Sequence, residues 1–313
     1  MAQRKFNRID VHHHLSPPGY IAELGPNQRL TPQTLAWTPQ KAIEQMDQGG
    51  VDLAITSITT PGLWFGLHSA ARRLARLCND YAAKIRTDHP GRFGLFVNLP
   101  IPDVDGSLAE IEYGMDQLKA DGVCLFTSYG DKWIGDPAFD RVFDELNRRK
   151  AVVYVHPTTC NCCTNLLPGF PDSAIEYGTD TTRAMARLVF SGTFARCPDI
   201  KMIWSHGGGT MPFLYDRFNN ATKMPQYKDQ FPGGWTPVAN KMHYDIAQVP
   251  NKPALSALSA VVQSSQILFG TDFPWLDSAH HVKGLKESGV FNEAQLRQID
   301  IENAARLMPQ YAV

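Results

Sequence analysis

Short apolar runs alternate with amphipathic segments eight times along the 313 residues of the chain. The apolar runs are rich in β-branched and aromatic residues and are too short for helices, so they predict strands. The segments between them repeat apolar residues every three or four positions, which predicts helices with one buried face. The expected strands are residues 6–11, 51–58, 93–99, 122–127, 151–155, 201–205, 242–246 and 267–271.

Eight strand–helix units without a linker between them predict one α/β domain, residues 1–313, folded as a (β/α)8 barrel of the TIM type. The Pro-rich, poorly periodic segment 16–37 is expected to be a loop insertion after the first strand. An open doubly wound sheet is the alternative. That architecture would place a glycine-rich phosphate loop after the first strand, and the chain has none there.

Charge and hydropathy exclude several classes of protein. The net charge is -1, from 30 basic and 31 acidic residues, which gives no electrostatic basis for binding nucleic acid or an anionic membrane. No apolar run approaches the ~20 residues that span a bilayer. The N-terminal residues lack the apolar core of a signal peptide, so a cytoplasmic location with reduced thiols is expected.

Polar residues stand where four of the predicted strands end: His12 and His14 at the first, His156 at the fifth, His206 at the sixth and Asp272 at the eighth. Each alone is as compatible with a cap or a structural hydrogen bond. Barrel enzymes, however, place their chemistry at these strand ends. His12 and His14 share a face of their strand, and imidazole and carboxylate groups bind zinc, manganese and similar ions. The pattern therefore predicts one shared metal site.

Neighbouring residues refine this prediction. Asp10 is expected on the His12 side of the strand, either supporting a ligating histidine or forming a buried structural hydrogen bond, whereas His13 should point away. Glycines 207–209 would let a ligand approach the backbone closely. Binuclear barrel hydrolases commonly bridge two metals with a carboxylated lysine at the fourth strand. Residues 122–127 contain no lysine, which favours one metal.

Cysteines form one unusual cluster, Cys160, Cys162 and Cys163. No second Cys or His pair follows at the spacing of a zinc ribbon. An ordinary loop that carries thiols is therefore favoured over a structural zinc site.

His-x-His after the first strand, His156, Ser-His-Gly-Gly-Gly at 205–209 and Gly-Thr-Asp-Phe-Pro at 270–274 resemble the amidohydrolase superfamily. The resemblance covers nearly the whole chain and favours the branch of aminocarboxymuconate semialdehyde decarboxylase and the non-oxidative aromatic decarboxylases. Segments 9–14, 59–62 and 146–149 are similar in particular to 6-methylsalicylate decarboxylases. Several ortho-hydroxybenzoate decarboxylases have Glu-x-His in the first motif, whereas this chain has His-x-His there. This difference separates the chain from the resorcylate and dihydroxybenzoate types.

The resemblance implies a single divalent ion, zinc or manganese, held by His12, His14, His156 and Asp272. It further implies that His206 is catalytic. Asp272 or His206, or water on the metal, would supply the proton that replaces CO2 on the ring. Arg217, in the helix after the glycines, would enter the substrate site of a neighbouring subunit, so that at least a homodimer is expected. The alternative for Arg217 is a solvated helix residue.

The first functional hypothesis is non-oxidative decarboxylation of a small aromatic acid, an ortho-hydroxybenzoate such as 6-methylsalicylate, to CO2 and a phenol. Trp64, Phe65 and Phe273 follow strands two and eight and would form an aromatic wall for such a planar substrate, or else simply pack in their loops. The second hypothesis is a mononuclear hydrolase of a lactone or amide, in which the metal activates water. A metal-binding scaffold without turnover is the third.

Overall fold

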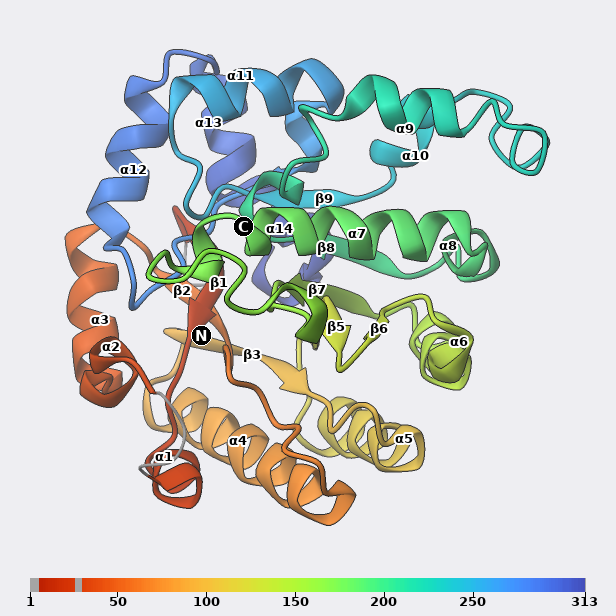
Figure 1. The fold of residues 1–313 in the computed structure, drawn as a ribbon. Coiled ribbons are helices and arrows are strands. Elements are labelled where there is room, and N and C mark those ends of the chain that lie inside the picture. Colours follow the sequence, from red (N-terminus) through yellow and green to blue (C-terminus); the bar gives the residue numbers. More distant parts are fainter. Residues whose placement is uncertain (1–5, 26–29, 313) are drawn as a thin grey trace.

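The computed structural model describes residues 6–25 and 30–312. Its main sheet has eight strands, each parallel to its neighbours (Figure 1). In spatial order the strands are β1 (Ile9–His14), β2 (Leu53–Ser57), β3 (Phe93–Asn98), β4 (Gly122–Phe126), β7 (Val152–His156), β8 (Lys201–Trp204), β9 (His243–Asp245) and β10 (Ile267–Leu268). The short hairpin of β5 (Ser128–Tyr129) and β6 (Lys132–Trp133) follows β4.

Backbone hydrogen bonds bring the last strand back to the first. The amide of Val11 donates to the carbonyl oxygen of Phe269 (3.0 Å), and the amide of Asp272 donates to that of His12 (2.8 Å). Further along β1, the amide of His14 donates to the carbonyl oxygen of Phe273 (2.9 Å). The predicted (β/α)8 barrel is therefore confirmed. The same bonds place the end of β1 directly beside the segment that carries Asp272.

Helices surround the strands, as Figure 1 shows. The eight-residue-or-longer ones are α3 (Pro39–Gln48), α4 (His68–Asp88), α5 (Val104–Glu112), α6 (Asp140–Arg148), α7 (Glu176–Phe190), α11 (Lys252–Val261) and α12 (Ser278–Glu287). Their apolar faces pack on the outer side of the strands in one large core. Shorter helices are α8 (Thr193–Arg196), α9 (Tyr215–Ala221), α10 (Trp235–Ala239), α13 (Glu293–Arg297) and α14 (Asn303–Leu307).

The segment expected to be a loop insertion is partly helical. It contains α1 (Pro18–Leu24) and α2 (Pro32–Ala36), each with proline in its first turn, where the missing amide hydrogen costs nothing. Tyr20 and Leu24 of α1 are buried in a cluster with residues of α4. The sequence did not indicate these helices because each has at most two turns and buries only one or two side chains, which is too few to give a clear hydrophobic period. Residues 26–29 of the insertion lie outside the described part.

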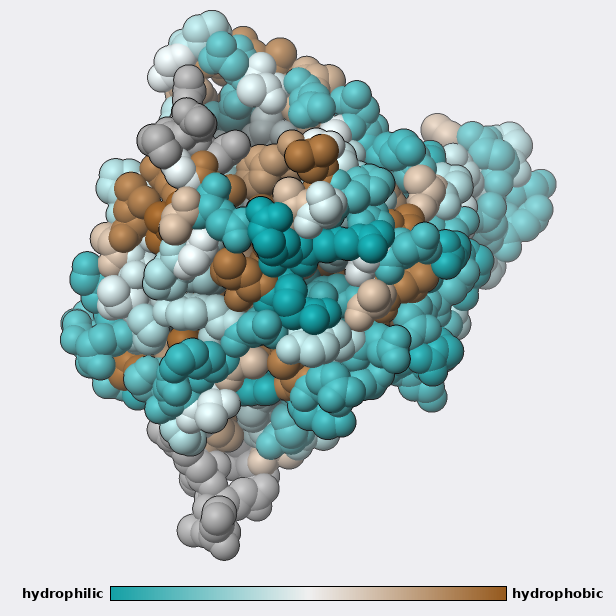
Figure 2. Space-filling model, turned by 90° about the horizontal axis from the view of Figure 1, so that it is seen from below, coloured by the Kyte–Doolittle hydropathy of each residue, from teal (hydrophilic) through white to brown (hydrophobic). Residues whose placement is uncertain are grey.

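The molecular surface is polar over the face that carries α4 and α5. Figure 2 views this face, and hydrophobic residues appear on it only in separate small groups. Among the described residues, no helix has the length and apolar character needed to cross a membrane.

Candidate active site

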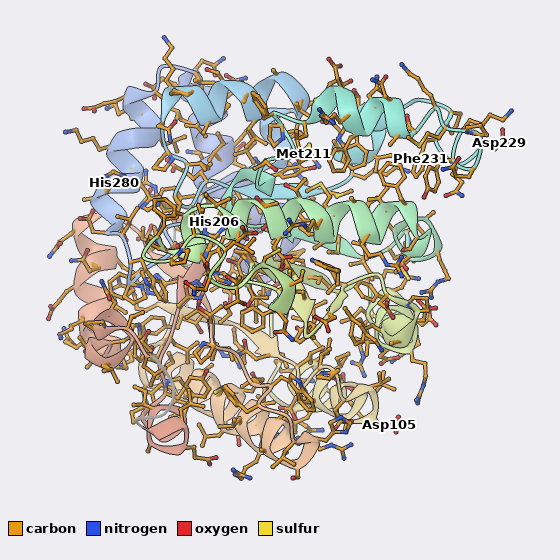
Figure 3. All side chains as sticks on the ribbon, in the orientation of Figure 1. Asp105, His206, Met211, Asp229, Phe231 and His280 are labelled. Carbon is orange, nitrogen blue, oxygen red and sulfur yellow. The ribbon has the colours of Figure 1, made fainter. Side chains whose placement is uncertain are left out.

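Five side chains from four strand ends converge at the carboxyl end of the barrel. His12 Nε2 lies 3.0 Å from His14 Nε2 and 3.2 Å from Asp272 Oδ1, and His14 Nε2 lies 3.1 Å from that same oxygen. His206 Nε2 is 3.4 Å from Asp272 Oδ2. Figure 3 shows His206 in the centre of the barrel, in contrast to His280 at the periphery. The chain thus brings together all the residues for which a shared metal site is predicted.

Two overlapping sets of four could hold an ion. One donor atom from each of His12, His156, His206 and Asp272 lies within 4.8 Å of the other three. The set expected from sequence contains His14 in place of His206. His14 Nε2 lies 3.0 Å from His12 Nε2 and 3.1 Å from Asp272 Oδ1, whereas His206 Nε2 lies 3.4 Å from Asp272 Oδ2. We favour the set with His14 on this ground. His206 then lies beside the centre, where it faces the cavity.

Electrostatics at this point favour a cation. Burial lowers the pKa of His12, but the carboxylates of Asp245 and Asp272 outweigh it and raise that pKa to about 10. Burial raises the pKa of Asp272, yet His12 above all holds it well below its usual range. Burial also lowers the pKa of His14 and, with the neighbouring imidazoles, that of His156. A divalent ion fits these nitrogen and oxygen donors and would replace the proton on His12.

Asp245, at the end of β9, is a site residue that the sequence analysis missed. Its Oδ2 accepts a hydrogen bond from His12 Nδ1 (2.9 Å), and its Oδ1 accepts from the backbone amides of His206 and Ala247 (2.9 Å each). A carboxylate on Nδ1 fixes the ring so that Nε2 faces the metal position. The rule applied to the other strand ends would have found it, because residues 242–246 were a predicted strand.

Of the two roles expected for Asp10, the structure supports the buried structural hydrogen bond and not the support of the His12 ring. The pairing of β1 with β2 shifts register between Asp10 and His13, which breaks the simple alternation of side chains. Asp10 Oδ2 therefore accepts from His13 Nδ1 (3.0 Å) and from Thr271 Oγ1 (2.6 Å), while Oδ1 accepts from the backbone amide of His12 (2.9 Å). Asp10 forms structural hydrogen bonds, and the ring of His12 is hydrogen-bonded by Asp245 instead. His13 points away from the site, and its ring stacks on Phe273 with centroids 4.8 Å apart.

Three residues around the centre have left-handed backbone conformations that are unusual for residues other than glycine: His206 (φ 52°), Gln248 (φ 60°) and Asp272 (φ 59°). All three line the same cavity. Gln248 is a second residue not anticipated from sequence, and its Nε2 donates to Asp272 Oδ2 (2.8 Å). Such conformations persist where the surrounding structure imposes them, and they are common at functional sites.

A cavity of about 710 Å³ opens above the centre and reaches His156, His206 and Asp272. Its aromatic residues are Tyr177, whose ring packs edge-on against His156, and Trp275, which packs edge-on against His14. The remaining wall includes Thr59, Thr60, Thr179, Thr210, Gln248 and Val249. No lysine or arginine is among the described residues that line it.

The aromatic wall thus differs from the predicted one. Neither Trp64 nor Phe273 lines this cavity. The ring of Trp64 lies 5.2 Å from that of His68 at the start of α4, and Phe273 is occupied by its stacking on His13. Phe65 packs partly buried against the cluster under α1. Tyr177 and Trp275 provide the flat apolar surfaces instead. The geometry does not support Trp64 or Phe273 as substrate contacts.

The glycines after β8 serve mainly to let parts of the protein pack closely. A Cβ on Gly209 would lie 2.2 Å from the carbonyl oxygen of Gly178 in α7, and one on Gly208 would lie 2.8 Å from the ring of Tyr244. Both have positive φ. Only Gly209 also lines the cavity, so close approach of a ligand is at most part of their role.

Arg217 lies on α9 with its side chain exposed and is not in the wall of its own chain's cavity. Its role at a neighbouring subunit's site stays a prediction.

Comparison with known proteins identifies the family of this chain. The amidohydrolase family model matches residues 9–309, so the chain belongs to the amidohydrolase family. It is 34% identical to "Decarboxylase yanB" of Aspergillus niger, over 97% of this chain and 88% of that protein. It is 33% identical to 6-methylsalicylic acid decarboxylase of Penicillium expansum, over 97% of this chain and 96% of that one.

A solved structure has the same fold. It is the dihydroxybenzoic acid decarboxylase of a Polaromonas species, crystallised with manganese and the inhibitor 2-nitroresorcinol. Its TM-score is 0.84 at 20% identity, and the match covers 99% of this chain and 98% of that one.

Proposed function

We propose that the protein is a metal-dependent, non-oxidative decarboxylase of a small aromatic acid, which releases CO2 and a phenol. The observation that carries the proposal is the convergence of His12, His14, His156, His206 and Asp272 beneath a cavity with aromatic walls. The relatives named as decarboxylases support it over nearly the full length of the chain.

The substrate class is an ortho-hydroxybenzoate such as 6-methylsalicylate. The fungal 6-methylsalicylic acid decarboxylase, at 33% identity, supports this choice. The cavity supports it as well: its volume of about 710 Å³ accommodates a single ring, and Tyr177 and Trp275 offer flat surfaces to such a ring.

The cofactor is one divalent ion, manganese or zinc. His12, His14, His156 and Asp272 would hold it, and the manganese in the Polaromonas structure supports this assignment. The bound ion would supply the positive charge that orients the substrate's carboxylate and hydroxyl groups and stabilises negative charge on the phenol oxygen. That charge is needed because no lysine or arginine lines the described cavity and Asp272 is itself anionic.

The chain's own residues position the ring and move the proton. Decarboxylation forms a C–H bond at the ring carbon and breaks its bond to the carboxylate, which leaves as CO2. His206 and Asp272 lie 3.4 Å apart at the cavity floor, so this pair can hold the required proton next to that carbon. Gln248 donates to Asp272 Oδ2 and so fixes the orientation of that carboxylate. Tyr177 and Trp275 would restrict the ring to one plane and exclude water.

A homodimer, in which Arg217 reaches the partner's cavity, and a cytoplasmic location are also part of this proposal. An arginine from a second subunit would add a cation that the described cavity wall lacks.

The test is a CO2 assay on protein stripped of metal and reloaded with Mn²⁺ or Zn²⁺. We expect CO2 from 6-methylsalicylate or a close ortho-hydroxybenzoate, only after reloading. The matching O-methyl ether should not react, because it cannot present the ortho oxygen as a phenolate. His156→Ala, which lacks one of the converging imidazoles, is the negative control and should release no CO2 after the same reloading. Acid release from lactones or amides, without CO2 from any benzoate, would replace the proposal with the hydrolase alternative.

A further inference from the structure

A second group of metal-ligating side chains lies outside the histidine–aspartate centre. Cys160, Cys162 and Cys163 belong to the loop between β7 and α7, four residues beyond His156. This green segment crosses in front of the barrel strands in Figure 1. The sequence favoured an ordinary loop here, because no second pair of ligands follows at zinc-ribbon spacing.

The three thiols converge in the folded chain. The Sγ atoms of Cys160 and Cys162 lie 3.2 Å apart, and those of Cys162 and Cys163 lie 3.6 Å apart. All three sulfur atoms are within 4.8 Å of one another. A single 3₁₀ turn, Asn161–Cys163, closes this arrangement, with the amide of Cys163 donating to the carbonyl oxygen of Cys160 (2.9 Å).

These separations suit sulfur ligands around one ion. A Zn–S bond of ~2.3 Å in tetrahedral geometry puts two thiolate sulfurs ~3.8 Å apart. The observed separations differ from that value by about 1 Å at most. A disulfide, by contrast, requires ~2.05 Å between two sulfurs and leaves the third thiol unused.

The exposure of the group and the charge beside it are compatible with an ion held by three thiolates. Cys160 and Cys163 are buried, and Cys162 is exposed, which leaves one side open for an ion to enter and for a water molecule to complete its coordination. Arg183 of α7 donates to Cys163 Sγ (3.4 Å). Three thiolates with one divalent ion carry a net charge of -1, and this guanidinium, which also lies 3.4 Å from Glu176, places a positive charge beside them.

We propose that Cys160, Cys162 and Cys163 form a second metal site, which takes a thiophilic divalent cation of the Zn²⁺ class through three thiolates. Binding converts three S–H groups into three metal–sulfur bonds and releases three protons to solvent, with no change in oxidation state. The site is separate in chemistry from the first centre, whose ligands are nitrogen and oxygen.

The loop also connects this site to the cavity. Ser173, Ala174 and Ile175, at the far end of the same connection, line the cavity wall. Arg183 lies six residues along α7 from Tyr177, which also lines the cavity. A metal ion at the thiols would therefore fix one end of a segment whose other end faces the substrate.

The experiment uses the full, reduced protein with its first centre preloaded with Mn²⁺, titrated with Cd²⁺. Thiolate-to-cadmium charge transfer gives an ultraviolet band that nitrogen and oxygen ligands cannot produce, so displaced Mn²⁺ would not imitate it. We expect one Cd²⁺ per chain on the thiols, with a dissociation constant in the micromolar range or below. A thiol reagent should then find Cys162 protected.

Cys162→Ser is the decisive variant, because this side chain is exposed and its replacement leaves the packing intact. It should weaken Cd²⁺ binding at least tenfold and reduce the band by about a third, since one of the three thiolates is lost. Asn161→Ala in the same turn and Cys197→Ala, a buried thiol elsewhere, should bind like the parent protein. No charge-transfer band in the reduced parent protein, or an equal band and affinity in Cys162→Ser, would overturn the proposal.

Discussion

At the scale of single residues, the site depends on pairs of side chains more than on isolated ligands. His12 is held between two carboxylates, with Nδ1 on Asp245 and Nε2 facing Asp272. His206 and Gln248 both reach Asp272 Oδ2. Each pair fixes which atom carries a proton and which presents a lone pair, and this determines whether an ion or a substrate can be bound.

Asp245→Asn should lower metal affinity by about 10- to 100-fold. The asparagine oxygen can still accept from the amides of His206 and Ala247, which leaves its NH2 group facing His12 Nδ1. The proton of His12 is then driven to Nε2, the atom that should bind the ion. Titration of metal-free protein with Mn²⁺ measures the change. Asp300→Asn, at a carboxylate paired with Arg8, is the control, and equal affinities in the two variants would contradict the assignment.

Metal affinity should depend on pH through His12. The two carboxylates raise its pKa to about 10 against the opposing effect of burial, so the metal-free protein carries a proton there at neutral pH. Ligation displaces that proton, and the apparent affinity should rise about tenfold per pH unit between roughly 6.5 and 9. Calorimetry of metal binding in buffers of different ionisation enthalpy counts the released protons.

In metal-free protein the interaction of His12 with the two carboxylates also stabilises the fold below pH 6.5, and this contribution is lost as the pH rises through 10.

Single substitutions distinguish the two possible ligand sets. His14→Ala and His156→Ala should lose metal and turnover together, whereas His206→Ala should retain about one metal per chain and lose most of its kcat, by about 10²-fold or more. Elemental analysis beside the CO2 assay provides both readouts. Metal loss in His206→Ala with retention in His14→Ala would assign His206 to the ligands and His14 to the surroundings.

At the scale of elements, the site depends on how a few segments meet. The register shift in β1 allows His12 and His14 to reach the centre while Asp10 and His13 bond to each other on the other side. The glycines after β8 let that strand end pack against α7, from which Tyr177 reaches the cavity. Small residues here determine distances between elements.

Gly209→Ala should destabilise the protein by more than about 2 kcal/mol. The new Cβ would lie 2.2 Å from the backbone oxygen of Gly178, at a φ of +67° that alanine adopts poorly. Gly169→Ala is the matched control: its φ is +86°, but nothing lies within 4 Å of the added Cβ, so only the conformational cost of about 1 kcal/mol remains. Denaturant unfolding measures both. Similar losses of stability would show that packing against α7 is unimportant.

At the scale of the whole molecule, the described chain forms the centre and most of the cavity wall but places no lysine or arginine in that wall. The predicted source of one is Arg217 of a second subunit. Phe213, four residues before Arg217 and just before α9, is 89% exposed, which is unusual for a phenylalanine.

Mixing two inactive variants tests the shared site. Arg217→Ala keeps an intact centre but would deprive its partner of the arginine, and His206→Ala has the opposite defect. After subunit exchange half of the dimers are mixed, and one of the two sites in each is complete, so activity should return to roughly a quarter of the parent level. A lack of recovery, with exchange verified by native mass spectrometry, would exclude action between subunits.

The sequence by itself determined the barrel and most of the centre. Hydrophobic periodicity is a local property, and eight short strands separated by amphipathic helices have few other ways to bury their apolar faces. Parallel strands of a barrel all end on one side. His12, His14, His156, His206 and Asp272 could therefore be assigned to one site from their places at strand ends alone.

Only the tertiary structure decided which side chains touch. The strand-end rule could have assigned Asp245 to the site, but only the structure shows its bond to His12 and that of Gln248 to Asp272, because nothing local in the sequence fixes contacts across a barrel. Tyr177 and Trp275 replaced Trp64 and Phe273 as the aromatic wall for the same reason: loop conformation depends on what the loop packs against. The register shift in β1 decided between the two roles open to Asp10, and one tight turn brought three cysteines together. Sequence patterns specify which strand end a residue occupies, whereas distances of 3 Å between residues far apart in the chain arise from packing.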